Sequence, residues 1–327
     1  MNKILSIIIP SCNMEKYLGQ CLDSLLVQSI NDIEILVIND GSKDRTSEIA
    51  HEYEGRYPQS IRVIDKPNGH YGSCINRGLQ EATGKYVKIL DADDSFDSNI
   101  FEKFIGFLKK TDVDLVLSNY SIVDETGALT ENRNMAGSSS EQKVFAFNEI
   151  PEILSSKYMA MHGVCYRRQM LIDMGYKQTE GVAYTDQEWI FEPMTKVMTI
   201  ALFPLSFYRY LVGRDGQSIS KDVIIKNMGI QLTLIAKRVS LLERVRKTLS
   251  DAHYDYLTWR LKYALTSTYR TLLLRKEANN LVPKLMEIDD SIRDVSPELY
   301  QDLGNMTIKS WLPIRFVKRW RKTVHKQ

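Results

Sequence analysis

The N-terminal part of the chain alternates between short apolar runs and stretches with helical periodicity. The apolar runs occupy residues 5–10, 33–38, 61–64 and 87–90 and are rich in isoleucine, valine and leucine. Continuous apolar runs of this length are typical of strands that are buried on both faces of a sheet. Because the intervening loops are short, we expect right-handed strand–helix–strand units. The chain is therefore predicted to form an α/β fold with a mostly parallel sheet flanked by helices.

Helices are predicted between these strands, and further elements follow the fourth strand. Asn13, Ser42 and Thr185 each precede a helical pattern and are expected to cap its first turn. Residues 124–141 are polar and rich in Gly, Ser and Asn, which predicts a mobile surface excursion. The remaining strand patterns lie at residues 113–118, 163–166 and 200–210, and the helical patterns at 72–82, 99–109, 150–158, 168–174 and 186–198.

The pattern changes beyond about residue 220. Strand patterns end there, and residues 224–249 and 252–275 carry long helical patterns. A chain of 327 residues is long enough for a large core with an appended subdomain. We predict a boundary near residue 220, between an α/β domain of residues 1–220 and a helical subdomain of residues 221–327.

The composition narrows the classes of protein to consider. The net charge of +2 gives no argument for a nucleic-acid partner. No apolar run approaches the roughly 20 residues of a transmembrane helix, and residues 4–10 are too short for the apolar core of a secretory signal. The four cysteines show no metal-binding or redox spacing, which favours reduced thiols. We therefore expect a cytoplasmic protein.

Three carboxylates follow the fourth apolar run, at Asp91, Asp93 and Asp94. On an extended chain, Asp91 and Asp93 project to the same side. Two such like charges raise each other's pKa, and a divalent cation resolves this conflict because carboxylate oxygens suit Mg²⁺ or Mn²⁺. Open α/β sheets bind ligands at the carboxyl ends of their strands. The stretch therefore predicts a metal site at the lip of the sheet, and a solvated acidic turn is the alternative.

Several motifs between residue 4 and about residue 220 together resemble the family 2 glycosyltransferases. They are residues 6–13 (SIIIPSCN), 37–42 (VINDGS), 76–78 (NRG), 84–94 (GKYVKILDADD) and 185–189 (TDQEW). The resemblance implies a GT-A fold, which is Rossmann-like, and transfer of a sugar from a nucleoside diphosphate donor, expected to be a UDP-sugar. One difference stands at Cys12, where the family often has a tyrosine that is expected to stack on the base.

The resemblance also assigns roles at the donor site. Asp93 is carried over as a metal ligand and Asp91 as a residue near the ribose or the metal, with Mn²⁺ or Mg²⁺ as cofactor. Asp40 would accept the uracil N3–H, and an Asx turn is the alternative for this residue. For Asp94, a helix cap is an open interpretation. The other nucleotide-binding candidates are Pro10, Ser11, Asn13 and Asn76.

Asp186 stands where the family has its general base, at the start of a predicted helix. The helix dipole favours its charged form there, so it must act through closeness to the acceptor hydroxyl. The alternative is that Asp186 only charges a helix start. One base and direct displacement imply inversion at the anomeric carbon, and this outcome rests on the resemblance.

Weaker candidates lie in three other segments. His70 and Tyr71 are expected to border the donor sugar, and Lys66 is a cation suited to phosphate, with a solvated surface charge as the alternative. His162 is a further candidate, with a purely structural histidine as the alternative. The residues that resemble the family's loop over the diphosphate are Arg214, Gln217 and Ser218.

The C-terminal residues carry a separate signal. Residues 303–327 include seven basic residues and no acids, interspersed with Trp and Phe. A basic helix within residues 309–326 suits an anionic membrane surface, and packing on its own protein or a partner is the alternative. On the membrane interpretation, the protein is peripheral on the inner face of the cell membrane. Its acceptor would then be a glycan or a lipid-linked oligosaccharide, as in capsule or exopolysaccharide assembly. A homo-oligomer also stays open.

Two other functions compete with the glycosyltransferase. An aspartyl-phosphate-type phosphohydrolase also places D-x-D after an apolar strand, but normally after the first strand of its sheet. An inactive nucleotide-sugar-binding module is the second alternative, and the presence of Asp93 and Asp186 speaks against it.

Overall fold

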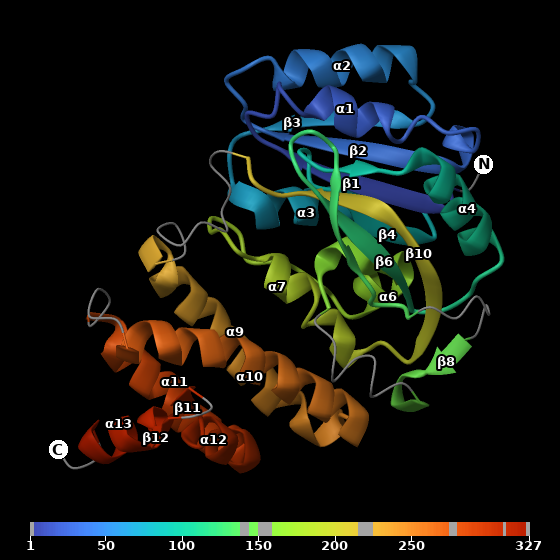
Figure 1. Cartoon of the computed structure of the whole chain (residues 1–327). Helices are drawn as coiled ribbons and strands as arrows, with labels where there is room; N and C mark the ends of the chain where they lie inside the picture. Colours follow the sequence, from blue (N-terminus) through green and yellow to red (C-terminus); the bar gives the residue numbers. More distant parts are fainter. Residues whose placement is uncertain are drawn as a thin grey trace. The chain divides into compact units, whose positions relative to one another are not determined.

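The computed structural model describes residues 3–137, 144–149, 159–214, 225–274, 280–309 and 312–324 (Figure 1). The chain forms two compact units, Met1–Gln217 and Ser218–Gln327. The helix predicted at residues 150–158 and the loop candidates Gln217 and Ser218 lie outside the described residues.

Four parallel strands form the N-terminal half of the main sheet. They are β1 (Leu5–Ser11), β2 (Ile33–Asp40), β3 (Ile61–Lys66) and β4 (Tyr86–Ile89), in the order β3-β2-β1-β4. Leu5 of β1 is in register with Ile33 of β2 and with Tyr86 of β4. The residues of β1 from Leu5 to Ile9 are fully buried, which explains the continuous apolar run of this strand. This half confirms the predicted parallel sheet and brings the carboxyl ends of its strands to one edge.

The other half of the sheet is mixed. β9 (Val164–Arg167) runs antiparallel to β4 and to β6 (Leu115–Val123), whereas β10 (Thr199–Leu211) runs parallel to β6. The short strands β5 (Ser95–Phe96) and β8 (Val144–Ala146) pair with β10 in antiparallel orientation.

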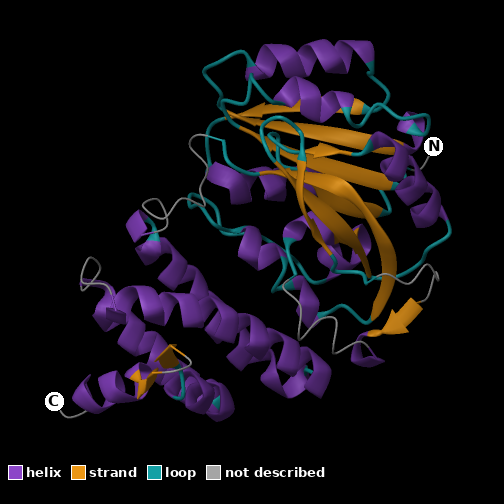
Figure 2. Ribbon diagram, in the orientation of Figure 1, coloured by secondary structure: helices purple, strands orange, loops and turns teal. Residues whose placement is uncertain are grey.

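Helices flank this sheet (Figure 2). They are α1 (Leu18–Asp23), α2 (Thr46–Arg56), α3 (His70–Glu81), α4 (Ser98–Lys109), α6 (Arg168–Asp173) and α7 (Asp186–Trp189). α3 packs on β1 and β2, and α4 packs on β10. The contact between α3 and β1 requires Gly78, because a Cβ at this position would lie 2.5 Å from Ile8 Cγ2.

Two predicted elements differ from the structure. Within the polar stretch at residues 124–141, β7 (Leu129–Arg133) pairs antiparallel with the second part of β6. This part of β6 makes no pairs with β9, so β7 supplies its hydrogen-bond partners. The helix predicted at residues 186–198 is only the short α7, followed by a 3₁₀ turn that begins at Pro193. Proline cannot donate the hydrogen bond that a continuing helix needs.

Two of the three predicted helix caps are wrong, because α1 and α2 begin after Tyr17 and Arg45. Thr185 does stand at the N-cap position of α7, but its side chain makes no capping hydrogen bond. Asn13 and Ser42 instead bind the loops after β1 and β2 to each other. The Asn13 Oδ1 accepts from the N–H of the residue that follows Ser42 at 2.8 Å, and the Asn13 N–H donates to Ser42 Oγ at 3.0 Å.

The second unit, Ser218–Gln327, is helical as predicted. Its helices are α9 (Met228–Val245), α10 (Asp251–Leu274), α11 (Val282–Val295), α12 (Pro297–Gly304) and α13 (Phe316–Val324). Its core includes Leu232, Leu257 and Leu285, which are fully buried. A small antiparallel sheet of β11 (Thr307–Lys309) and β12 (Leu312–Arg315) departs from the purely helical expectation. None of the described helices in either unit is long and apolar enough to cross a membrane.

Candidate active site

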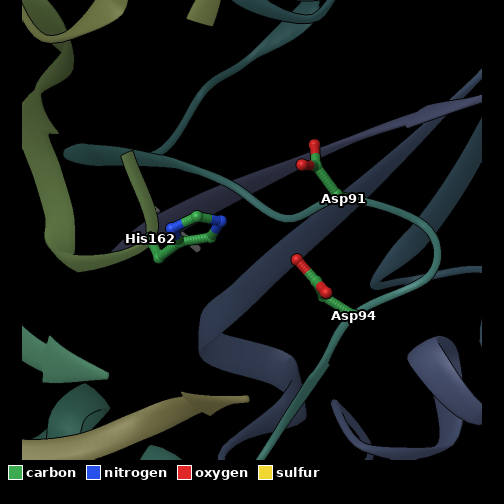
Figure 3. A group of neighbouring side chains, drawn as sticks. All are labelled: Asp91, Asp94 and His162. Carbon is green, nitrogen blue, oxygen red and sulfur yellow. The ribbon is translucent and has the colours of Figure 1, made fainter. Parts of the chain in front are cut away.

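The three aspartates that follow β4 lie in a tight turn, which we call the aspartate turn (residues 91–94). The Asp94 N–H donates to the Asp91 carbonyl oxygen at 3.0 Å, as in a β-turn. The turn brings one ligand atom each of Asp91, Asp94 and His162 within 4.8 Å of one another (Figure 3). The expected extended chain, with Asp91 and Asp93 on one side, is therefore wrong, because the backbone reverses between them.

Asp91 is a central member of this cluster. Its Oδ1 accepts a 2.8 Å hydrogen bond from the Tyr71 hydroxyl, and its N–H donates to Tyr208 Oη at 3.2 Å. Burial, and then the charges of Asp93 and Asp186, raise the pKa of Asp91 to about 7. The surroundings thus supply too little positive charge to hold Asp91 in its usual ionised state, and a bound cation would change this.

Asp94 joins the aspartate turn to β10. Its Oδ2 accepts from the Tyr208 hydroxyl at 2.6 Å, and its Oδ1 accepts from the Leu211 N–H at 2.8 Å. Burial, and then the neighbouring aspartates, raise its pKa well above the usual range. The helix-cap interpretation of Asp94 is wrong, because the side chain of Asp97 caps α4 instead.

Asp93 is paired with Arg214. The Arg214 Nε lies 2.5 Å from Asp93 Oδ2, and the two side chains are only 16% and 11% exposed. The guanidinium carbon also lies 5.4 Å from the centroid of the Tyr17 ring, at cation–π distance. The predicted loop arginine therefore reaches the aspartate turn.

His162 lies on a 3₁₀ turn (Met161–Gly163), and its half-buried ring contacts three tyrosine rings. The ring stacks on Tyr210 with centroids 4.2 Å apart and meets Tyr208 edge-on at 4.9 Å. Its Nδ1 is buried and makes no hydrogen bond to a described residue. Burial, and then the charge of Lys88, lowers the pKa of His162 to about 3, so the ring is neutral. Neutral imidazole is the form that binds metal ions.

Lys88 is a residue near the site that the sequence patterns did not single out. It is fully buried in β4, and its ammonium donates to the carbonyl oxygens of His162 at 2.6 Å and Val164 at 3.3 Å. Burial lowers its pKa to about 7. A lysine inside an apolar strand pattern is the signal that would have found it, because lysine is almost never fully buried unless its charge has partners.

These side chains fit a divalent cation. Asp91 and Asp94 offer carboxylate oxygens, His162 offers a ring nitrogen, and Asp93 adjoins them in the same turn. The raised pKa of Asp91 indicates a site that lacks positive charge, and the Nδ1 of His162 makes no hydrogen bond to a described residue, which leaves it available as a ligand. Carboxylate oxygens suit Mg²⁺ or Mn²⁺.

The nucleotide candidates of β1 and β2 lie at the carboxyl ends of adjacent strands. Ser11 is aligned with Asn39, and Asp40 with Lys66. Asp40 is buried, its Oδ1 accepts from the Gly69 N–H at 2.9 Å, and the same oxygen pairs with Lys66 Nζ. Lys66, predicted as a phosphate-binding cation, is thus engaged with Asp40 in this structure.

The chain just after β1 shows what stands at the position of the missing tyrosine. Pro10 is half-buried next to the end of the strand, and Cys12 follows with intermediate exposure. The side-chain amide of Asn68 donates to Cys12 Sγ at 3.6 Å. A small thiol beside an amide therefore occupies the place where the family often has an aromatic ring.

Three of the described residues other than glycine have left-handed backbones, and each is a candidate site residue or lies close to one. They are Asn13, His70 and Tyr184, with φ angles of 55°, 63° and 64°. Such conformations cost about 1–3 kcal/mol each and persist where the surrounding structure imposes them. His70 is exposed at the start of α3, and Tyr184 stands two residues before Asp186.

Asn76 binds the protein's own chain. Its Nδ2 donates to Gln178 O at 2.9 Å and to Glu180 Oε1 at 2.8 Å, and its Oδ1 accepts from the Gln178 N–H at 2.8 Å. The amide therefore ties α3 to the segment that leads toward α7. A contact between Asn76 and a nucleotide stays a prediction.

Asp186 is the first residue of α7. Its charge contributes to the raised pKa of Asp91, Tyr71 and Tyr210, for all of which burial is the main cause. The Gln187 side-chain amide donates to Asp186 Oδ2 at 3.0 Å. Asp186 therefore lies within electrostatic reach of the aspartate turn, which is the placement that a role in the same reaction requires.

Comparison with known proteins gives a family match and two informative relatives. A family model described as Glycosyl transferase family 2 matches residues 6–175. The chain is 28% identical over 286 residues to the uncharacterized glycosyltransferase YibD of Escherichia coli, covering 86% of this chain and 82% of that protein. It is 40% identical over 116 residues to the uncharacterized glycosyltransferase EpsJ of Bacillus subtilis, covering 36% of this chain and 33% of that protein. The chain thus spans most of YibD but about a third of EpsJ.

Among solved structures, the fold is similar to that of TarS from S. aureus. The crystal structure of TarS 1–349 in complex with UDP-GlcNAc matches with a TM-score of 0.67 at 19% identity. The match covers 90% of this chain and 82% of that chain. It confirms the predicted GT-A fold with its helical C-terminal region.

Proposed function

Because the chain belongs to glycosyl transferase family 2 and is a glycosyltransferase, we propose that it moves a sugar from a UDP-sugar to a hydroxyl of a glycan or a lipid-linked oligosaccharide. The transfer inverts the anomeric carbon and uses Mn²⁺ or Mg²⁺. The observation that carries this proposal is the aspartate turn. It follows β4, next to β1 with its nucleotide candidates, and within electrostatic reach of Asp186.

The nucleoside is assigned to the sheet edge formed by β1 and β2. Lys66 and the Gly69 N–H both bind Oδ1 of Asp40 and so fix the orientation of its carboxylate. We assign the other oxygen, Oδ2, to the uracil N3–H, since a carboxylate can only accept. The choice of uridine is supported by TarS, which has the same fold and was crystallised with UDP-GlcNAc.

The diphosphate is assigned to the aspartate turn. The residues that would hold the cation are Asp91, Asp93 and Asp94 together with His162. A bound divalent ion neutralises the charge that develops on the leaving diphosphate. Arg214, which pairs with Asp93 in the structure, supplies a planar guanidinium suited to the same phosphate oxygens.

Asp186 is the proposed general base. Its charge is felt by Asp91 and by Tyr71, so its carboxylate lies near the groups that would surround the donor sugar. It takes the proton from the acceptor hydroxyl as that oxygen attacks the anomeric carbon. One displacement on one face of the sugar gives inversion.

Family membership speaks against the first competing function, and the Asp186→Asn variant described below separates the second from the proposed transfer. A phosphohydrolase does not agree with the family match. An inactive nucleotide-sugar-binding module would bind nucleotide without transferring sugar. We further propose that the enzyme works in the cytoplasm, at the inner face of the cell membrane, where a lipid-linked acceptor would be presented.

Thermal-shift and sugar-transfer measurements on the wild type and three carboxylate variants test the proposal. We expect UDP with Mn²⁺ to raise the melting temperature of the wild type by mass action. Asp186→Asn should keep this stabilisation and lose transfer by about a hundredfold to ten-thousandfold, the range for general bases. Asp93→Asn should lose the metal-dependent part of the stabilisation. Glu125→Gln, at an exposed turn after β6, is the control.

Two results would contradict the proposal. If no nucleotide stabilises the protein in a metal-dependent way, the aspartate turn does not hold a metal–diphosphate complex. If Asp186→Asn keeps full transfer, another group must act as the base.

A further inference from the structure

The basic helix α13 uses its apolar residues inside the second unit. Phe316 is 7% exposed, Val317 is fully buried, and the helix packs on α10 and α12. These two apolar side chains, which the membrane interpretation would place in lipid, are therefore covered by protein. Three basic residues of the helix stay exposed, namely Lys318, Arg319 and Lys322.

A cavity of about 550 Å³, which we call the basic pocket, opens beside two of these residues. It lies between the end of α12 and α13. Three lining residues are cationic and none is acidic. The lining residues are Tyr300, Gln301, Gly304, Asn305, Lys318, Arg321 and Lys322.

Arg321 forms a fixed part of the pocket wall. Its Nε and Nη2 donate to the two oxygens of Asp289 at 2.8 and 2.6 Å, and its Nη1 donates to Tyr300 O at 2.7 Å. The guanidinium carbon also lies 3.4 Å from the centroid of the Tyr300 ring. Arg321 and Asp289 are 7% and 1% exposed, so this pair is neutral as a whole and rigid. The net charge of the pocket therefore comes from the two lysines.

Lys318 and Lys322 lie one helical turn apart and face the same cavity. Neither of them forms an ion pair with a described residue. Like charges at this spacing repel each other on a helix. An anion placed between the two ammonium groups would remove this repulsion.

The opposite side of the pocket offers neutral donors. Gln301 and Asn305 lie one turn apart at the end of α12, and both line the cavity. Their side-chain amides can donate to an oxygen without adding charge. Gly304 keeps this wall close to Arg321, because a Cβ there would lie 2.8 Å from Arg321 Nη1. Cations on one side and amide donors on the other are a suitable arrangement for a tetrahedral oxyanion.

We propose that the basic pocket binds a phosphate ester, with Lys318 and Lys322 as the charged contacts and Gln301 and Asn305 as neutral donors. The phosphate belongs either to the headgroup of an anionic lipid or to a soluble phosphorylated molecule. This site is separate from the aspartate turn and does not depend on the proposed transfer reaction. It gives the basic C-terminal segment a specific ligand in place of insertion into lipid.

The experiment uses the full chain and two charge-matched double variants. Lys318→Gln with Lys322→Gln removes two charges from the basic pocket. Arg315→Gln with Arg319→Gln removes two exposed charges from the same segment without touching the pocket. Binding is measured to inorganic pyrophosphate by calorimetry, and by co-sedimentation to phosphatidylcholine vesicles with and without phosphatidylglycerol. Circular dichroism verifies that both variants fold.

We expect the lysine variant to lose roughly 30-fold in affinity, the product of two lysine–phosphate contacts, and the arginine variant to lose markedly less. A lysine-specific loss on phosphatidylglycerol vesicles identifies a lipid headgroup as the source of the phosphate. A lysine-specific loss on pyrophosphate alone identifies a soluble phosphate ester. Equal losses in both variants would show diffuse attraction by the basic segment as a whole and would overturn the proposal. Unchanged binding in the lysine variant would also overturn it.

Discussion

The amide of Asn76 gives a quantitative prediction, because the structure uses both of its polar atoms inside the protein. It makes three hydrogen bonds, two with the backbone of Gln178 and one with the Glu180 side chain, at 2.8–2.9 Å. The Asn76 residue is only 7% exposed. Replacing Asn76 by alanine removes all three bonds and leaves the polar backbone groups of Gln178 buried without these partners.

The expected cost of Asn76→Ala follows from these bonds. Each bond contributes about 1 kcal/mol net, so the free energy of unfolding should fall by about 3 kcal/mol. For a unit the size of the α/β domain, this lowers the melting temperature by roughly 6–12 °C. Urea unfolding followed by circular dichroism measures the change, and the dependence on urea concentration should stay the same because no extra surface is exposed.

A double-mutant cycle with Glu180→Ala separates the three bonds of Asn76. The bond to Glu180 involves a half-exposed carboxylate, so we expect the two bonds to the Gln178 backbone to contribute the larger share of the 3 kcal/mol. The coupling energy between Asn76 and Glu180 should be about 1 kcal/mol. A loss below about 0.5 kcal/mol in Asn76→Ala would refute the reasoning. If nucleotide binding fell while stability stayed constant, Asn76 would act in the nucleotide pocket, as the sequence resemblance implies.

Three further predictions follow. Hydrogen bonds to two carboxylates raise the pKa of His51. The stabilisation by the charged ring is therefore present below about pH 6.5 and is lost as the pH rises through the pKa of the folded state. In urea titrations, His51→Ala should destabilise the protein more at acidic than at alkaline pH. Lys88→Met removes the donor to the His162 carbonyl and should weaken Mn²⁺ binding about tenfold by calorimetry, whereas an unchanged affinity would rule out a positioning role. Gly72→Ala would overlap a backbone oxygen and should cost about 1–3 kcal/mol in urea unfolding, whereas the control Gly106→Ala, in open space on α4, should stabilise by about 1 kcal/mol.

The parallel half of the sheet could be predicted because burial on both faces leaves an unambiguous pattern. Each residue of β1 from Leu5 to Ile9 is fully buried, so the run has almost no polar interruption. β7 is the opposite case, since all five of its residues are exposed and no apolar periodicity can mark it. β7 forms because the second part of β6 has hydrogen-bonding groups that β9 leaves unpaired. This is a tertiary effect, and the local strand propensity of residues 129–133 does not reveal it.

The helix boundaries failed for a related reason. Asn13 and Ser42 are residue types that commonly cap helices, but the loops that carry them lie beside each other at the ends of β1 and β2. Each polar side chain therefore finds a partner in the other loop before it finds one in its own helix. Local sequence cannot show which of these hydrogen bonds the fold will choose.

The acidic residues of the candidate site could be predicted from the sequence, but the residues that hydrogen-bond them could not. Asp91, Asp93 and Asp186 follow from motif and position. Tyr208 hydrogen-bonds both Asp91 and Asp94, but it lies more than a hundred residues away within an ordinary strand pattern. Nothing near it in the sequence distinguishes its hydroxyl from that of any other buried tyrosine.

The aspartate turn shows how one wrong local geometry changes a chemical assignment. On an extended chain, Asp91 and Asp93 would share a face and Asp94 would point away. In the turn, the hydrogen bond from the Asp94 N–H to the Asp91 carbonyl brings the outer two carboxylates together, next to the His162 ring. Asp93, at the tip, is left to meet Arg214. The turn therefore groups two carboxylates beside the neutral His162 ring, whereas Arg214 pairs with Asp93, the aspartate that the family resemblance assigns as a metal ligand.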